Sequence, residues 1–353
     1  MIVLGIESSC DETAVGIVEN GHILHSNAIA SSMDVQAMYG GVVPELAARS
    51  HMEAVIPAVE KSLLQANMTW DDIDAIAVTY GAGLGGSLLI GVLTARTLAI
   101  TKHKPLYAIN HVEAHIYANF LTSTSLPDYV LPAEQPQFPV LALIASGGHS
   151  QIVFFRDHFD YTLLGQTLDD AIGEAFDKVA KIIGLPYPGG PKVERLATEG
   201  NPHAYPLPKA KLAGKYDFSF SGVKTAVLRT AQAAIGADFT FPSFQLAERL
   251  SDTQKADIAA SFTRVALETV IDKLLLAYEE FAPKQVIIAG GVAASTPLRN
   301  MLAERLPIDI TYTDRKLCTD NGAMVATLGC FTAMHGLPVA DPRTLDIAPN
   351  LSM

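Results

Sequence analysis

The chain has 353 residues, of which 49% are hydrophobic and 18% are charged, and 25 basic against 37 acidic residues give a formal net charge of −12. This composition excludes a disordered acidic protein, which would be poor in apolar residues. Three cysteines are too few for a disulfide framework in a chain of this length. The length predicts roughly two domains. The negative charge disfavours nonspecific coating of nucleic acid or of anionic membranes.

The N-terminal residues 1–9 lack the basic segment and the long apolar run of a signal peptide. One uncharged stretch, 75–95, is long enough to span a membrane, but its five glycines favour a strand, a turn and the start of a helix. We therefore expect a soluble, cytoplasmic protein with reduced thiols and no contact with a membrane.

The first part of the chain alternates apolar runs with turn signals and helical patterns. In chain order, we predict strands over 2–7, 13–18 and 22–29, a helix over 44–66, a strand over 72–80, a helix over 87–103, a strand over 105–110 and a helix over 111–121. The next segment, 126–139, contains four prolines and is typical of a surface loop or a linker between two halves.

The same order of elements then begins again. We predict strands over 139–146, 150–156 and 161–167, a helix over 168–183, one or two helices within 243–281, a strand over 285–289, a helix from residue 297, a strand over 309–313 and a helix over 321–335. This duplicated order predicts two α/β lobes with mostly parallel sheets, whose polar turns face a cleft.

The first polar turn lies in the run Gly5-Ile-Glu-Ser-Ser-Cys-Asp-Glu-Thr13 between two predicted strands. Small hydroxyl residues such as Ser9, together with backbone N–H groups, can hold phosphate in a turn of this kind. The carboxylates of Asp11 and Glu12 could position a metal ion or act as a base. An ordinary polar hairpin is an equally good interpretation of this run taken alone.

The second polar turn, Ala145-Ser-Gly-Gly-His-Ser150, occupies the matching place in the second half. Its two glycines allow the backbone to approach a ligand, and Ser146 and His149 can donate hydrogen bonds to phosphate or carboxylate oxygens. A tight hairpin turn would also explain the two glycines. The position, which repeats that of the first turn, favours a binding function.

A pair of histidines, His111 and His115, has the i, i+4 spacing that places both rings on one face of a helix, as a metal site requires. Glu113 lies midway between them, so the motif is not His-Glu-x-x-His, which disfavours a zincin-type metalloprotease. A third ligand must come from elsewhere. Asp320, in a polar turn before an apolar helix, is a candidate, although taken alone it is better explained as a helix N-cap.

Three further features could take part in binding. The strand ending in Gly290-Gly291 suits a nucleobase or ribose packed on the backbone. Asp177 on a helix and Gly190 at a helix start could grip a ribose or an acyl group, although most such acids only face solvent. Residues 201–231 hold five basic residues against one acid, a local charge of +4, with aromatic residues between them. This segment is either a phosphate-contacting surface or a solvated loop.

Taken together, these motifs resemble the TsaD/Gcp (YgjD) family, relatives of the catalytic subunit of KEOPS. They occur in the family's order across nearly the whole chain, and the ordered set is far more specific than any one motif. The segments that carry the resemblance are Gly5–Thr13, Asn110–His115, Ser146–His149, Gly173–Lys178, Tyr187–Pro191, Phe218–Lys224, Gly290–Ala294 and Cys318–Gly322.

The resemblance implies a two-lobed actin-like ATPase/sugar-kinase (ASKHA) fold with a duplicated mixed sheet and a central cleft. It implies an N-terminal lobe of residues 1–108 plus 322–353, and a C-terminal lobe of residues 109–321 with the metal and nucleotide motifs. The implied activity is transfer of a threonylcarbamoyl group from threonylcarbamoyl-AMP to N6 of the adenosine at tRNA position 37, in tRNAs that read ANN codons (t6A formation).

The family pattern also implies ligands and partners. It assigns one divalent metal ion, Fe²⁺ or Zn²⁺, to His111, His115 and Asp320, and ATP with Mg²⁺ is a further candidate ligand. Besides tRNA, it implies a TsaB-like dimerisation partner and a TsaE-like ATPase. The implied nucleotide- and acyl-binding positions are Ala145, Ser146, Gly147, Gly148, His149, Asp177, Gly190, Glu194 and Ser295, to which we add Ser9 of the first turn.

Two of these positions need comment. The family usually carries Asn where this chain has Ser295, and Ser keeps a hydroxyl but lacks the bidentate amide. At Glu194 the family carries an acid, so this position fits.

The chemistry of the implied donor fits the residues. Because the donor is an activated mixed anhydride, no protein nucleophile is required, and Glu12 or Asp11 could take the proton from the adenine amine. The alternatives are an ATP-dependent small-molecule kinase and a nucleotide-gated interaction protein of the same fold.

Overall fold

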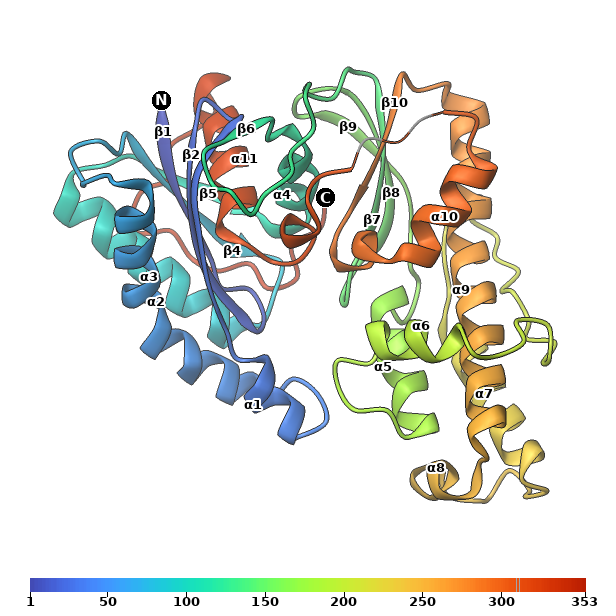
Figure 1. The fold of residues 1–353 in the computed structure, drawn as a ribbon. Helices are drawn as coiled ribbons and strands as arrows, with labels where there is room; N and C mark the ends of the chain where they lie inside the picture. Colours follow the sequence, from blue (N-terminus) through green and yellow to red (C-terminus); the bar gives the residue numbers. More distant parts are fainter. Residues whose placement is uncertain (309, 311) are drawn as a thin grey trace. The chain divides into compact units, whose positions relative to one another are not determined.

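A computed structural model describes residues 1–308, 310 and 312–353. The chain forms two compact units, which are drawn in Figure 1. Unit 1 contains Met1–Gln137 and Thr311–Met353, and unit 2 contains Phe138–Ile310. The first boundary falls at the end of the proline-rich segment 126–139. Segments 109–137 and 311–321, which the family pattern assigns to the C-terminal lobe, belong to unit 1. The helix after residue 110 packs on the C-terminal helix of this unit.

Unit 1 is built on a six-stranded sheet of order β5-β4-β1-β2-β3-β6. The first three strands form an antiparallel meander, and β4 and β5 add in parallel beside β1. The strands are β1 (Ile2–Glu7), β2 (Glu12–Glu19), β3 (Ile23–Ser31), β4 (Ala75–Gly81), β5 (Leu106–Asn110) and β6 (Ser123–Thr124). The sheet is therefore mixed rather than mostly parallel, because connections as short as those of the meander can join only antiparallel neighbours.

Helices cover both faces of this sheet (Figure 1). Helices α2 (Pro44–Ala66) and α3 (Gly85–Lys102) pack on one face, where Leu4 and Ile6 contribute to the core. Helices α4 (His111–Tyr117) and α11 (Gly322–Met334) pack on the other, while the short α1 (Met33–Met38) precedes α2.

Glycine permits the close packing of α11 on the sheet. A Cβ atom at Gly5 would lie 2.3 Å from the backbone nitrogen of Ala326, and one at Gly16 would lie 2.4 Å from that of Ala323. Real Cβ atoms do not approach backbone atoms so closely, so these two strand positions require glycine. The turn before α11 is thereby held against the first strands.

Unit 2 repeats the core of unit 1 with a four-stranded sheet of order β10-β7-β8-β9. Strands β7, β8 and β9 form an antiparallel meander, and β10 pairs in parallel with β7, as β4 does with β1. The elements are β7 (Val140–Ala145), β8 (Ser150–Asp157), β9 (Asp160–Gln166), α5 (Ile172–Ile183), α6 (Gly190–Ala197), α7 (Ser221–Ala234), α8 (Leu246–Arg249), α9 (Asp252–Phe281), β10 (Gln285–Ala289) and α10 (Thr296–Arg305).

Some expected elements differ from the structure. Helix α5 begins at Ile172 rather than at residue 168, since the carboxylates of Asp169 and Asp170 bond outside the helix, to the Phe220 amide and to Lys224. A strand was expected over 309–313. Residues 309 and 311 lie outside the described residues, and residues 310, 312 and 313 are not in a strand. Helix α7 was not predicted from the sequence. Within the described chain, no helix has the length and apolarity that a membrane crossing requires.

Candidate functional site

Both histidines of the i, i+4 pair lie on the short helix α4. Asn110 caps this helix, because its side-chain oxygen accepts hydrogen bonds from the amides of Val112 (2.9 Å) and Glu113 (3.4 Å). The cap starts the helix at His111 and brings the rings of His111 and His115 to 4.8 Å between centroids. Both residues are buried.

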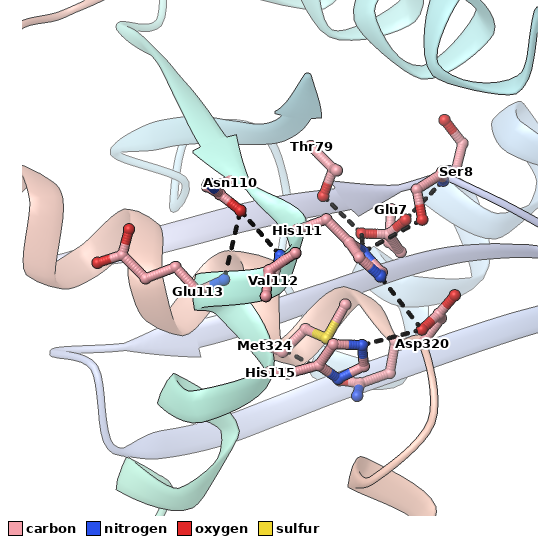
Figure 2. Close-up of polar contacts among 12 residues, drawn as sticks. Glu7, Ser8, Thr79, Asn110, His111, Val112, Glu113, His115, Asp320 and Met324 are labelled. Carbon is pink, nitrogen blue, oxygen red and sulfur yellow. Dashed lines mark hydrogen bonds and ion pairs between the residues drawn. The ribbon is translucent and has the colours of Figure 1, made fainter. Parts of the chain in front are cut away.

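Asp320 joins them from the turn before α11, as Figure 2 shows. Its Oδ1 lies 3.2 Å from Nε2 of His115 and 3.7 Å from Nε2 of His111. The N-cap of α11 is the next residue, Asn321, which accepts a hydrogen bond from the Met324 amide at 3.0 Å. Asp320 is therefore not a helix cap, and its carboxylate is directed at the two imidazoles.

The three side chains fit a divalent metal ion. Their ligand atoms all lie within 4.8 Å of one another. Two ligands about 2.1 Å from one ion, at tetrahedral or octahedral angles, are roughly 3.0–3.4 Å apart, close to the distances from Asp320. Both ring nitrogens of His115 are buried, and apart from the carboxylate of Asp320 beside Nε2 they have no polar partner among the described residues. Two imidazoles and one carboxylate suit Fe²⁺ as well as Zn²⁺.

Residues of the first strands orient His111 on its other ring nitrogen. Nδ1 of His111 lies 3.1 Å from the Ser9 hydroxyl and 3.3 Å from Oε2 of Glu7. The same Glu7 oxygen accepts a 2.5 Å hydrogen bond from Thr79, and Oε1 accepts one of 2.6 Å from the Ser9 amide. A carboxylate behind a ligating histidine is the usual way of fixing the ring and its tautomer.

Charge in this cluster changes two pKa values. Burial disfavours the protonated form of His111, but the carboxylates of Asp320 and Glu7 outweigh it and raise the pKa of His111 to about 9. Burial also opposes ionisation of Glu7, yet the adjacent His111 lowers the pKa of this carboxyl below its usual value. Without an ion the ring therefore holds a proton at neutral pH, and metal binding must displace it.

The two candidate bases lie at the end of the first turn. Glu12 begins β2, where Oε1 accepts a 2.8 Å hydrogen bond from Ser31, and Oε2 is buried without a hydrogen-bond partner among the described residues. Burial raises the pKa of Glu12 to about 7 and also raises the pKa of Asp11. A carboxylate with a pKa near neutrality has the property expected of a general base.

The second polar turn lies in unit 2 and is joined there by two other motifs. The Ser146 amide donates to the His149 carbonyl (2.8 Å), and the Ser146 hydroxyl accepts from the His149 amide (3.1 Å). The Gly173 amide donates to the Ser146 carbonyl at 3.2 Å. A Cβ atom at Gly290 would lie 2.5 Å from the carbonyl oxygen of Ala145. Three segments that are distant in sequence thus meet at this turn, and Gly147 and Gly148 are exposed.

The remaining predicted binding residues also lie in unit 2. Oδ1 of Asp177 accepts a 2.7 Å hydrogen bond from the Gly189 amide, which places Asp177 beside the start of α6 at Gly190. Glu194 lies on α6. Ser295 caps α10, accepting a hydrogen bond from the Leu298 amide at 3.1 Å.

Three of the five basic residues of segment 201–231 form ion pairs within unit 2. Lys209 pairs with Glu268 and Asp272 at 2.8 and 2.7 Å, Lys215 pairs with Glu280, and Lys224 pairs with Asp170. The interleaved aromatic residues Tyr216, Phe218 and Phe220 are buried in the core. These contacts attach the segment to α9. They therefore do not favour the phosphate-contacting surface that the local charge of +4 suggested.

Sequence reasoning missed the part that Glu7 plays behind His111. The available signal was a carboxylate at the end of the apolar run Ile2–Ile6, since acids are rarely buried without a partner. Its partner could not be predicted, because His111 is 104 positions away.

Comparison with known proteins identifies the family. Residues 23–327 match the family model TsaD, described as tRNA N6-adenosine threonylcarbamoyltransferase. The chain belongs to this family. It is 46% identical over 360 residues to the Thermomicrobium roseum protein of that name, covering 100% of this chain and 97% of the relative. It is 43% identical over 342 residues to the Bacillus subtilis protein of that name, covering 96% and 92%. The resemblance stated from the motifs is thus confirmed.

Solved structures of low sequence identity show the fold alone. HypF from T. kodakarensis matches with a TM-score of 0.58 and 15% identity, over 97% of this chain and 49% of that one. Component A of the (R)-2-hydroxyglutaryl-CoA dehydratase of Acidaminococcus fermentans matches with a TM-score of 0.50 and 14% identity, over 95% and 99%. The fold class is the predicted α/β actin-like ATPase/sugar-kinase class, with one mixed sheet in each unit.

Proposed function

We propose that this chain transfers the threonylcarbamoyl group from threonylcarbamoyl-AMP to N6 of the adenosine at position 37 of tRNAs that read ANN codons. The observation that carries the proposal is the similarity, at 41–46% identity over nearly the full length, to proteins named for this transfer. The buried His111, His115 and Asp320 cluster supports it. Neither a small-molecule kinase nor a nucleotide-gated interaction protein is favoured by these names.

His111, His115 and Asp320 would hold one divalent ion, Fe²⁺ or Zn²⁺. When bound there, the ion would supply Lewis-acid neutralisation of charge on oxygens of the donor. The protein supplies the rest of this site: Asn110 starts the helix that carries both rings, and Glu7 and Ser9 fix the orientation of His111. The donor is already activated, so these residues need only bind and orient it.

We assign donor binding to the turn around Ser146. The exposed backbone of Gly147 and Gly148 leaves room for a phosphate or acyl oxygen beside its amides, and a Cβ atom at either glycine would meet nothing within 4 Å. Ser146 and His149 brace the turn. We assign ribose and adenine contacts to Asp177, Gly190, Glu194 and Ser295, and ATP with Mg²⁺ is a further candidate for these positions.

Glu12 is our first candidate for the base that takes the proton from the adenine amine, and Asp11 is the second. The support is the buried Oε2 of Glu12, which has no hydrogen-bond partner among the described residues, and the pKa of about 7. A base of this strength is half ionised at neutral pH and can accept a proton as the amine attacks.

We propose a TsaB-like dimerisation partner for the outer face of α2 and α3. Exposed apolar side chains gather there, namely Met52, Ile56, Leu89, Leu93 and Ile100. Helices α2 and α3 pack against each other, so these residues lie on adjacent helices. Size-exclusion chromatography of the two proteins, mixed and separate, tests this pairing. The TsaE-like ATPase rests on the resemblance alone.

The charge and the substrate give two further expectations. With a net charge of −12, this chain alone should bind tRNA weakly, because neutralisation of phosphates dominates such affinity. A tRNA substrate and three free cysteines support a cytoplasmic location.

The deciding experiment is to incubate the protein with tRNA, threonine, bicarbonate and ATP, together with the companion proteins, and to analyse the nucleosides by mass spectrometry. We expect threonylcarbamoyladenosine only when this chain is present. Formation of the product without this chain, or a phosphorylated small molecule in its place, would contradict the proposal.

A further inference from the structure

A buried histidine of α2, His51, contacts the first polar turn. Its Nδ1 lies 2.7 Å from the Thr13 hydroxyl, and its Nε2 lies 3.0 Å from the carbonyl oxygen of Cys10. A carbonyl oxygen can only accept, so Nε2 carries the proton and Nδ1 accepts the hydrogen bond of Thr13. Burial lowers the pKa of His51, which keeps the ring neutral. The ring therefore bonds to one residue within the turn and one just after it.

Helix α3 holds the same turn from its own N-terminal part. The Leu84 amide donates to the Ser9 carbonyl at 2.8 Å, and the Ser8 hydroxyl donates to the Ser87 carbonyl at 2.9 Å. The Ser87 hydroxyl also donates to the Cys10 carbonyl, at a longer 3.4 Å. Of the two bonds to Cys10, that of His51 is the shorter. Two helices thus fix the backbone of residues 8–10.

The first polar turn also contacts His111, a proposed metal ligand. The Ser9 hydroxyl lies 3.1 Å from Nδ1 of His111, and the Ser9 amide donates at 2.6 Å to Glu7, whose other oxygen lies 3.3 Å from the same Nδ1. A shift of the turn therefore moves both groups that face Nδ1. Because the ring is rigid, such a shift also changes the direction of Nε2, the nitrogen that faces Asp320.

We propose that His51 is a positioning residue: from α2 it fixes the Cys10 carbonyl, and through Ser9 it sets the orientation in which His111 meets the metal ion. Among the described residues, His51 bonds to Thr13 and Cys10 and to no proposed ligand, and the contacts run from His51 to Cys10, then Ser9, then His111. The proposal rests on the proposed function only for its effect on tRNA modification. Its effect on metal geometry can be measured without tRNA.

The test uses the full chain loaded with Co²⁺, whose visible absorption reports the ligand geometry. His51→Leu removes both hydrogen bonds. His51→Gln places an amide nitrogen near Nε2 and can still donate to Cys10, whereas His51→Asn places an oxygen near Nδ1 and can only serve Thr13. The matched control is Ser62→Ala, which removes another buried contact of α2, the 2.6 Å hydrogen bond to Ser26 on β3.

We expect His51→Leu and His51→Asn to shift the Co²⁺ absorption bands and to weaken metal binding by roughly tenfold, the lower end of the effect of outer-shell partners. His51→Gln and Ser62→Ala should keep the wild-type spectrum. If His51→Leu fails to fold, the contrast between the Asn and Gln variants decides. Lower melting temperatures with an unchanged spectrum and metal affinity in all His51 variants would overturn the proposal. Failure of the wild-type chain to form threonylcarbamoyladenosine with Fe²⁺ or Zn²⁺ and the companion proteins would overturn the transfer function instead, and the Co²⁺ spectra would still test His51.

Discussion

The turns that join β1 to β2 and β7 to β8 have the same place in two copies of one sheet core, yet they differ in environment. In unit 1, Ser8 and Ser9 are buried, bonded to α3 and to the groups behind His111. In unit 2, Gly147 and Gly148 are exposed, with nothing within 4 Å of where a Cβ atom would stand. One turn is bonded on several sides, and the other is open.

The two turns show how one duplicated core can serve either to fix a side chain or to receive a substrate. A turn bonded on several sides can fix a side chain such as that of His111, but it has little room for a substrate. An open glycine turn can receive a substrate oxygen on its amides, but it cannot hold a neighbour in place.

The largest effect should follow the loss of a proposed metal ligand in unit 1. His111→Ala should release the metal ion and reduce transfer by more than about 100-fold, since even outer-shell partners cost 10–100-fold. The matching change in the other turn, His149→Ala, should keep the metal ion and weaken donor binding. Metal analysis of the purified proteins and the tRNA assay measure both. Loss of the ion from the His149 variant would break the contrast.

Glu12 distinguishes the turns next, because its counterpart at the start of β8 is Ser150. As a base, Glu12 should make the rate rise with pH up to its pKa of about 7 and level off above it. Glu12→Gln should remove this rise and reduce the rate at pH 8 by about 100-fold, the lower limit for a general base. A variant with the wild-type pH–rate profile would transfer the role to Asp11.

The same group predicts a pH dependence of stability. The folded-state pKa of Glu12 lies above its usual 4.5, so the stability that the protonated form provides is complete below 4.5 and is lost as pH rises through about 7. Glu12→Gln should therefore gain stability relative to wild type between pH 5 and pH 8. Urea unfolding at both pH values measures this difference.

Glycine substitutions test how tightly each turn is enclosed. A Cβ atom at Gly91 of α3 would lie 2.3 Å from the Ser8 hydroxyl, so Gly91→Ala should lower the free energy of unfolding by about 1–3 kcal/mol, as overpacking does. Gly147→Ala should change it by less than about 0.5 kcal/mol, as at other open surface positions. Equal losses of stability would mean that the second turn is as enclosed as the first.

The smallest effect concerns Ser295, where the family usually has Asn. Both residues are good N-caps, so Ser295→Asn should keep α10 stable. The added amide should lower the KM for the donor by a few-fold, about 1 kcal/mol for one further hydrogen bond. A KM equal to that of wild type would remove this position from the adenosine contacts.

Local signals predicted much of the fold. Helix α2 was placed at its observed bounds, because Pro44 marks its first residue and Asn67 stops it in the left-handed conformation. Strand β10 was also placed at its observed bounds, as a buried run that ends in Gly290. The order of β7 to β9 followed from alternating apolar runs and short turns. Each of these features is encoded within a few residues.

The site was only partly predictable because its contacts are not local. Spacing brought His111 and His115 together, and the family pattern supplied Asp320, but nothing near Glu7 indicated a partner 104 positions away. For the basic segment, counting charges along the chain suggested a free surface. The acidic partners of Lys209 and Lys215 lie on α9, more than 50 positions later, and the partner of Lys224 is Asp170, 54 positions earlier. None of them can be seen in the segment itself.

The packing of α11 against β1 and β2 affects when unit 1 can complete its fold during synthesis. The ribosome releases the first strands early and all of unit 2 before residue 320, so the sheet of unit 1 must wait for its last covering helix. Until then Gly5 and Gly16 are exposed on that face, and a metal ion could bind only to the two histidines, without the carboxylate of Asp320. The proposed ion could gain its carboxylate ligand only after residue 320 has been made, so we expect chains that stop before this residue to bind it less tightly.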